Sequence, residues 1–492
     1  MERHPAAPCP RLLSGPFLLL SWLLLVFPCY LFAQSSDSLS ITEIEIRGAQ
    51  RTKNWIILQE MSLQEGQNIG RSELDAHLRQ SQQNLYNLNL FHSLEVTSTF
   101  LNDSSVSVLI KVLERGLIAG SPYLDIQERN TYDLIQALRV RNFRRAVIGG
   151  DFQLVNFMGR NETLRLFAQV GFSQVVSLRF SRPTLSRKRQ LDLELNARYR
   201  NEHEIIIGTE QGKVRWQSLE ATPMQRSWDF SAKLGKRLSL YKRASIQLGY
   251  QTFQIADSVG KLEVGGQIPR LITQLTGREF YPTLAFSLHE DRRDWHTFPQ
   301  KGYKWQMQAR FAGPKPIAST QFASFGFSWV HHLPIGKRWN FTYGTQQLLT
   351  LGDSIPYFEK HFIGMYRPQF ANLSYELRGY DPYAIDGTFI HMSKVEGKFA
   401  LFPIQQLRLP FIPLRRFQRF PFGIFATAFC DIGYVRDGSF NNLDPHWKDQ
   451  WLVGYGPGLN MVMFFDLLFR VEYAWNRQGD GGLYFNAILP IK

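Results

Sequence analysis

Long stretches of the chain alternate between hydrophobic and polar residues, which is the pattern of β-strands with two different faces. In residues 191–199 the odd positions are leucine, alanine or tyrosine, and the even positions are asparagine or charged residues. Residues 164–170, 303–311 and 469–475 alternate in a similar way. A soluble β-sandwich would also alternate. However, strands of about nine to eleven residues with aromatic residues near their ends are typical of strands that cross a bilayer.

An all-β transmembrane barrel over residues 117–492 is therefore the fold predicted for most of the chain. Backbone N–H and C=O groups in lipid must pair within the protein, so the strands are expected to close into a barrel. The alternation alone allows roughly 14 to 18 antiparallel strands. Long connections are expected at residues 201–225, 254–279 and 352–388, and the Pro- and Arg-rich residues 403–422 are expected to form a long turn.

Residues 39–115 have a different pattern, which predicts a small α+β domain before the barrel. Thr42, Ile44 and Ile46 alternate with charged residues, as in a half-buried strand. Two stretches with helical spacing follow, and Thr52 is expected to cap the first of them. Residues 94–112 then predict two further strands. The open edges of such a sheet can accept an extended polypeptide as an additional strand.

Residues 1–34 have the pattern of a secretory signal peptide: Arg3 and Arg11 precede an apolar stretch, and Ala33 offers a small residue for cleavage. A retained transmembrane anchor is the alternative, because the apolar stretch approaches the length of a membrane span. Export favours membrane head groups or lipopolysaccharide phosphates over nucleic acid as partners for a net charge of +14. After cleavage Cys430 is the only cysteine, so neither an internal disulfide nor a cysteine-based zinc site is expected.

The most informative short motif is Arg378-Gly379-Tyr380, which lies in a connection between two alternating stretches. If this connection folds into the barrel lumen, the guanidinium of Arg378 needs a carboxylate partner, because an unpaired charge in a narrow interior costs free energy. The alternative is that Arg378 is a solvated loop residue.

Asp431 is the first candidate partner for Arg378, and the alternation of side chains along a strand is compatible with it. Phe429, Asp431 and Gly433 share one strand face, so Gly433 leaves space beside Asp431 if that face points into the lumen. Glu396 lies on a strand between two lysines of the same face and is the second candidate.

The Arg-Gly-aromatic motif, followed by Phe-x-Asp-x-Gly at 429–433, resembles the signature of the BamA/TamA-type outer-membrane assembly and secretion barrels, the bacterial surface antigen family. The resemblance extends from about Leu39 to Tyr484 and implies about 16 strands. Residues 39–115, with Gly48 after the first strand and Asn87 to Phe91 after the second helix, resemble a single POTRA (polypeptide-transport-associated) domain.

The resemblance implies a barrel in the bacterial outer membrane with its N-terminal domain in the periplasm. Family members insert other barrels or export polypeptides and are thought to use a weak seam between the first and last strands. Here that seam would join residues 117–126 to residues 483–491, and Pro122 would interrupt a ladder there. The implied partners are unfolded outer-membrane or secreted polypeptides, outer-membrane lipids and accessory lipoproteins.

The function predicted from these features is that of an assembly factor that captures unfolded polypeptide and templates its insertion through the seam. The alternatives are a two-partner-type polypeptide secretion pore and a passive solute channel, although a porin would not need residues 39–115. No catalytic, cofactor-binding or metal-binding residues are predicted, and the protein is not expected to be an enzyme. The glycine-rich residues 454–458 precede an expected strand rather than a helix, so a dinucleotide site is not expected.

Overall fold

The structure is a computed structural model, and the residues it describes are 38–126, 138–186, 190–218, 223–256, 277–296, 298–314, 316–352, 355–364, 374–380, 383–408, 419–438, 446–463 and 467–488. The expected signal peptide, residues 1–34, lies outside the described residues. Across these ranges, none of the helices is long and apolar enough to cross a membrane.

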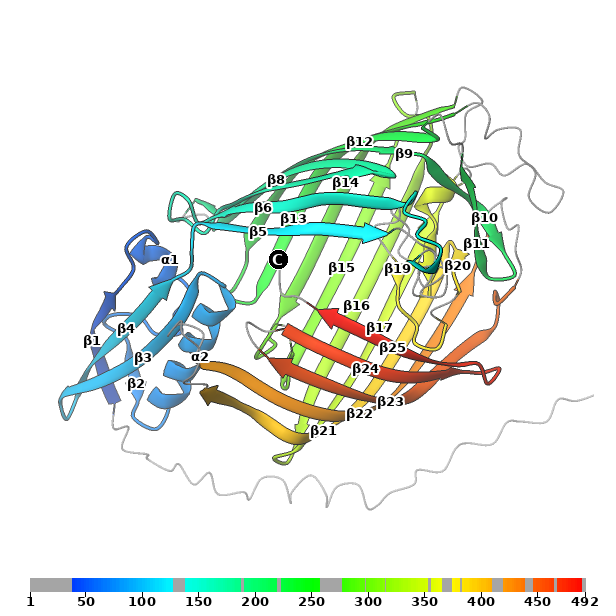
Figure 1. Ribbon diagram of the computed structural model, residues 1–492. Coiled ribbons are helices and arrows are strands. Elements are labelled where there is room, and N and C mark those ends of the chain that lie inside the picture. Colours follow the sequence, from blue (N-terminus) through cyan, green and yellow to red (C-terminus); the bar gives the residue numbers. More distant parts are fainter. Residues whose placement is uncertain are drawn as a thin grey trace, which may run out of the picture.

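The N-terminal α+β domain contains a four-stranded sheet and two helices (Figure 1). The sheet order is β2-β1-β4-β3, with β1 parallel to β4. Leu39, Ile41, Val106 and Ile110 are fully buried in the core of the domain. The elements are β1 (Ser38–Arg47), α1 (Asn54–Leu58), β2 (Asn68–Gly70), α2 (Leu74–Asn87), β3 (Phe91–Asn102) and β4 (Ser105–Glu114).

Two details of this domain differ from the sequence-based expectation. The short strand β2 was not expected, because three residues are too few to show an alternating pattern. Thr52 does not cap α1: the N-cap is Lys53, and no side chain caps the helix. Instead, the Thr52 hydroxyl accepts a 2.8 Å hydrogen bond from the side-chain amide of Asn156 in the barrel. A tertiary contact therefore replaces the local one.

Most of the described residues after the N-terminal domain form a 16-stranded sheet that wraps into a barrel, which confirms the predicted fold class (Figure 1). Consecutive strands of the sheet are antiparallel neighbours. The strands are β5 (Ile118–Ile126), β6 (Ala146–Val155), β7 (Thr163–Gly171), β8 (Ser173–Ser186), β9 (Leu191–Glu202), β12 (Gln225–Arg237), β13 (Lys242–Ile255), β14 (Arg278–Asp291), β15 (Gly302–Ala312), β16 (Phe322–Ile335), β17 (Trp339–Leu351), β21 (Phe389–Arg408), β22 (Arg419–Arg436), β23 (Trp451–Met463), β24 (Leu467–Asn476) and β25 (Gly481–Ile488).

The register of the strands separates an apolar outer face from a polar lumenal face. Phe152 on β6 is paired with Leu166 on β7, and both side chains are exposed on the outside. One residue along, Gln153 is paired with Arg165 on the opposite face. Because side chains alternate along a strand, this register places the hydrophobic set towards lipid and the charged set towards the lumen.

Two insertions lie at the end of the barrel opposite the N-terminal domain, which we call the distal end (Figure 1). The hairpin β10 (Glu204–Glu210) and β11 (Lys213–Ser218) is inserted between β9 and β12. The connection between β17 and β21 contains the 3₁₀ turn η2 (Tyr357–Glu359) and the small sheet of β18 (His361–Ile363), β19 (Ser374–Tyr375) and β20 (Ile385–Gly387). We call residues 355–388 the lumenal loop.

The sequence predicted a long turn at residues 403–422, but part of this range lies in strands. Strand β21 continues to Arg408 and β22 begins at Arg419, so the two strands extend past their outer neighbours as a hairpin. The pairing of β21 with β17 ends at Phe399. Proline is tolerated in this hairpin because a strand without an outer partner loses no ladder hydrogen bond there.

The first and last barrel strands, β5 and β25, are the two edges of the sheet. In the part of the chain that the structure describes, β5 is paired only with β6 and β25 only with β24. These edges coincide with the residues at which the sequence placed a seam, and Pro122 lies within β5.

Candidate functional site

Arg378 of the lumenal loop is buried and faces Asp431 on β22. Its Nε donates a 2.8 Å hydrogen bond to Asp431 Oδ2, and its Nη2 donates a 2.6 Å hydrogen bond to Oδ1. Asp431 is completely inaccessible to solvent. The structure therefore contains the ion pair expected from the sequence, with a bidentate geometry that a guanidinium and a carboxylate form readily.

Two further carboxylates complete the environment of Arg378. Its Nη1 lies 3.0 Å from Glu396 Oε2 on β21 and 2.8 Å from Glu472 Oε1 on β24. Glu396 was the second predicted partner, whereas Glu472 was missed. Strand parity does place Glu472 on the lumenal face with Arg470, but no sequence signal indicates which lumenal carboxylate lies next to the loop.

Additional lysine and arginine side chains balance these carboxylates. Lys394 lies 3.8 Å from Asp431, Lys398 lies 3.7 Å from Glu396, and Arg470 lies 3.8 Å from Glu472. Three carboxylates thus lie among four cations, Arg378 included. Within the described residues, no group of three or more His, Cys, Asp or Glu side chains is arranged to hold a metal ion.

Phe429 and three glycines give the loop its close approach to the barrel wall. The Arg378 guanidinium stacks over Phe429, with Cζ 3.7 Å from the ring centroid. Gly379 has a φ of +87°, which favours glycine. A Cβ at Gly433 would lie 3.0 Å from Leu377 of the loop, and a Cβ at Gly454 would overlap the Arg378 carbonyl oxygen.

Gly454 also explains the glycine-rich residues 454–458. These residues lie within β23 itself, not before a strand as the sequence predicted. At Gly454 the missing side chain leaves space for the backbone of the lumenal loop. A role in packing, rather than nucleotide binding, follows from this position.

Tyr380 connects the motif to the distal end of the barrel. Its side chain is fully buried, and its hydroxyl accepts a 3.3 Å hydrogen bond from the backbone N–H of Val453. Its ring meets Trp447 edge-on, with centroids 5.3 Å apart. The three residues of the predicted motif therefore have complementary roles. Arg378 binds the barrel wall, Gly379 allows the turn of the backbone, and Tyr380 packs against Trp447 at the distal end.

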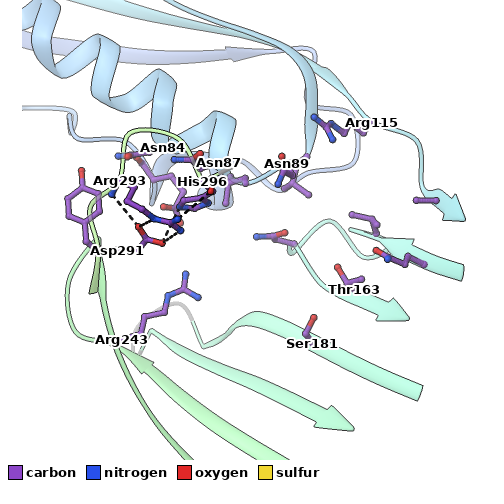
Figure 2. A pocket seen from close by; sticks show the side chains of 18 of the residues that line it. Asn84, Asn87, Asn89, Arg115, Thr163, Ser181, Arg243, Asp291, Arg293 and His296 are labelled. Atoms are coloured by element: carbon purple, nitrogen blue, oxygen red, sulfur yellow. Dashed lines mark hydrogen bonds and ion pairs between the residues drawn. The ribbon is translucent and has the colours of Figure 1, made fainter. Parts of the chain in front are cut away.

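A second feature is a cavity of about 960 Å³ between the N-terminal domain and the barrel. Figure 2 shows Asn84, Asn87 and Asn89 from the domain on one side and Arg243 from β13 on the other. Thr163 and Ser181 line the barrel side as well. The sequence did not predict this cavity, because its lining comes from segments far apart in the chain.

An ion pair joins the domain to the barrel beside this cavity. Arg237 at the end of β12 donates hydrogen bonds of 2.6 and 2.7 Å to the two carboxylate oxygens of Glu60. The N–H of Lys53 also donates a 2.9 Å hydrogen bond to the carbonyl of Gly159 in the barrel. These bonds and the Thr52–Asn156 bond hold the domain at the mouth of the barrel.

Comparison with known proteins yields one family and several solved structures. The model of the Omp85 superfamily domain matches residues 156–487. Among solved structures, BamA from Haemophilus ducreyi lacking POTRA domains 1–3 is 13% identical, with 92% of this chain and 85% of that chain covered and a TM-score of 0.50. CdiB from Escherichia coli is 12% identical, with coverages of 91% and 76% and a TM-score of 0.54. No curated protein sequence matches. At these identities the structural likeness concerns the fold.

Proposed function

The chain belongs to the Omp85 superfamily of outer-membrane barrels, and we propose that it is a non-enzymatic assembly factor that inserts other polypeptides into the outer membrane. In this function the N-terminal domain lies in the periplasm and captures unfolded polypeptide. The edge strands β5 and β25 then template new strands. Outer-membrane lipids and accessory lipoproteins are the expected further partners.

The observation that carries this function is the pair of edges in the 16-stranded sheet. An edge strand presents backbone N–H and C=O groups that can pair with another chain. In lipid such groups have no water to bind, so an incoming strand that pairs with them is strongly favoured. The short β25, with eight residues, offers few hydrogen bonds to hold a closed seam.

The N-terminal domain supports a capture step. Its sheet has two edges, β2 with three residues and β3 with 12 residues. Only β3 is long enough to pair with several residues of an extended polypeptide. Addition of a strand uses backbone hydrogen bonds and makes little demand on sequence, which suits a factor with many clients.

The occupied lumen argues against a passive solute channel. Arg378 and its three carboxylates fix the lumenal loop to the wall through buried ion pairs. A wide water-filled pore would leave these groups solvated. The loop instead blocks part of the interior and leaves the edges of the sheet as the route to the membrane.

A polypeptide secretion pore is the second candidate. A cavity of about 410 Å³ lies beside Arg378 in the lumen and is lined in part by Lys304, Lys394 and Arg470. This space is a starting point for a passage through the barrel if the loop moves. An exported chain would then cross the lumen instead of leaving through the edges.

Depletion of the protein, followed by quantitative proteomics of the outer membrane, distinguishes these functions. An assembly factor predicts a broad loss of barrel proteins. A dedicated secretion pore predicts loss of one exported polypeptide with other barrels unchanged. Altered solute uptake without either loss would contradict both and support a channel.

A further inference from the structure

A second set of charges lies in the lumenal loop on two consecutive residues, the partly buried Glu359 and the fully buried Lys360. Their charges are opposite, and their side chains reach different parts of the barrel. Neither residue belongs to the Arg378 motif, and no local pattern in the chain indicates their partners.

Glu359 binds the wall formed by β13, β14 and β15. Its Oε2 accepts a 2.5 Å hydrogen bond from Arg310 on β15, and its Oε1 accepts a 2.6 Å hydrogen bond from Tyr281 on β14. Arg310 also donates a 2.6 Å hydrogen bond to Gln251 on β13. Gln251 in turn donates to Asp229 on β12 at 2.8 Å. The contact thus extends over four adjacent strands.

Lys360 binds the other side of the lumen. Its Nζ donates a 2.7 Å hydrogen bond to Asp437, which directly follows β22, and lies 3.3 Å from Asp386 on β20. Lys448 completes the cluster, at 3.2 Å from Asp386 and 3.3 Å from Asp437. All four of these side chains are at least 97% buried. Burial of two lysines with two aspartates is tolerated because the charges are paired.

The two contacts are linked to the Arg378 motif through the small distal sheet. Lys360 directly precedes β18, which pairs with β20. Ile363 of β18 belongs to the same buried cluster as Leu377 and Tyr380. Asp431 lies near the end of β22 and Asp437 directly follows it, so one strand holds both Arg378 and Lys360.

We propose that Glu359 and Lys360 form a brace across the distal lumen, which joins the β13–β15 wall to β22, positions the Arg378 loop and keeps the lumen closed to ions. The brace is a positioning device: opening the lumen requires separation of buried ion pairs on at least one wall. Its contacts exist whether the protein inserts or secretes polypeptides, so its test does not depend on the assembly function.

The test is the ion conductance of the purified full-length protein in planar lipid bilayers. Glu359→Gln and Arg310→Gln each leave a partly buried partner without its counter-charge, and each is expected to raise the conductance or the open fraction severalfold. The double variant Glu359→Arg with Arg310→Glu restores a pair with reversed charges and is expected to return conductance towards the native level. Rescue by reversed charges separates positioning from general loss of packing.

Glu210→Gln is the matched control, because Glu210 forms an exposed ion pair with Arg215 in the distal β10–β11 hairpin. Its conductance is expected to remain native. If Glu359→Gln does not accumulate as a folded barrel, Tyr281→Phe, which removes only one hydroxyl from the brace, takes its place and is expected to open more often than the native protein. Native conductance in folded variants, or no recovery in the reversed pair, would overturn the brace.

Discussion

Arg378 in the lumenal loop and Asp431 in β22 share two hydrogen bonds of 2.8 and 2.6 Å inside the barrel. The pair links the connection between β17 and β21 to a strand residue that follows Arg378 by 53 positions. Because both groups are buried, removal of either one leaves the other without its bidentate counter-charge. This dependence makes the pair suitable for direct tests.

Arg378→Ala should destabilise the barrel, because it leaves Asp431, Glu396 and Glu472 without their shared cation. Removal of one partner from a buried ion pair costs about 3–5 kcal/mol. The measurement is the temperature at which the folded band disappears in heat-modifiability gels, together with complementation of a depleted strain. Arg215→Ala, which breaks an exposed pair, is the control. Native growth and native heat-modifiability in Arg378→Ala would contradict the role assigned to this residue.

Gly454→Ala should displace the lumenal loop, since the new Cβ would overlap the carbonyl oxygen of Arg378. Overpacking of this kind costs about 1–3 kcal/mol or more when backbone must move. Protease susceptibility of the loop and the same heat-modifiability assay measure the effect. Gly397→Ala on β21 is a matched control, because a Cβ added there would have no other atom within 4 Å. Equal behaviour of the two variants would rule out the close approach.

Glu60→Gln should loosen the N-terminal domain from the barrel mouth. The substitution removes the charge that receives two hydrogen bonds from Arg237, and hydrogen bonds to charged groups contribute about 1.5–3 kcal/mol. Limited proteolysis near residues 115–117 is expected to become faster, and the native contact should weaken as salt rises. Glu45→Gln, whose ion pair with Arg47 lies within one strand of the domain, should leave proteolysis unchanged.

Acid should weaken the distal part of the lumenal loop through His361. Burial lowers the pKa of His361 to about 4, while its Nε2 lies 3.0 Å from the Thr350 hydroxyl. The unfolded chain, with a histidine pKa of about 6.5, binds a proton more readily than the folded chain between these values. Stability is therefore full above about pH 6.5 and falls by about 3 kcal/mol as the pH decreases to about 4.

The measurement for His361 is the midpoint of thermal unfolding at several pH values for the native protein and for His361→Gln. Between about pH 6.5 and 4, the unfolding midpoint of the variant should fall less than that of the native protein, because the contribution of His361 is absent. His331→Gln serves as the control, because His331 is only half-buried beside Tyr343. A variant with the native pH profile would show that His361 does not titrate in this range.

A second pH effect, from the carboxylate of Asp386, should appear at lower pH. Burial alone would raise the pKa of Asp386, but the charges of Lys360 and Lys448 lower it below its ordinary value of 3.8. A depressed carboxyl pKa stabilises the folded state above the unfolded pKa and ceases to do so as the pH falls through the folded value. The stability that Asp386 contributes is therefore expected to be lost only below about pH 4. As the pH falls, this loss follows the loss of stability that His361 causes.

The sequence alone determined the local part of this structure. Alternation at a period of two marked the barrel strands and their lumenal faces, because the direction of a side chain on a strand depends only on its position in the strand. The same alternation was compatible with Asp431 and Glu396 as partners of Arg378, and the resemblance carried by the Arg-Gly-aromatic motif supplied the strand number. The N-terminal domain was predicted from helical and strand periods of its own.

Only the tertiary structure decided which distant groups meet. Three contacts join segments that no local pattern relates: Arg378 with Glu472, the Glu359–Lys360 brace, and Glu60 with Arg237. The alternation of side chains gives the face of a strand on which a residue lies, but not its neighbour across the lumen. Thr52 shows the same limit. The sequence predicted that it caps a helix, but its hydroxyl instead bonds to Asn156 of the barrel. Local geometry follows from the order of residues, whereas the pairing of buried charges depends on how the sheet curves and where the loop crosses it.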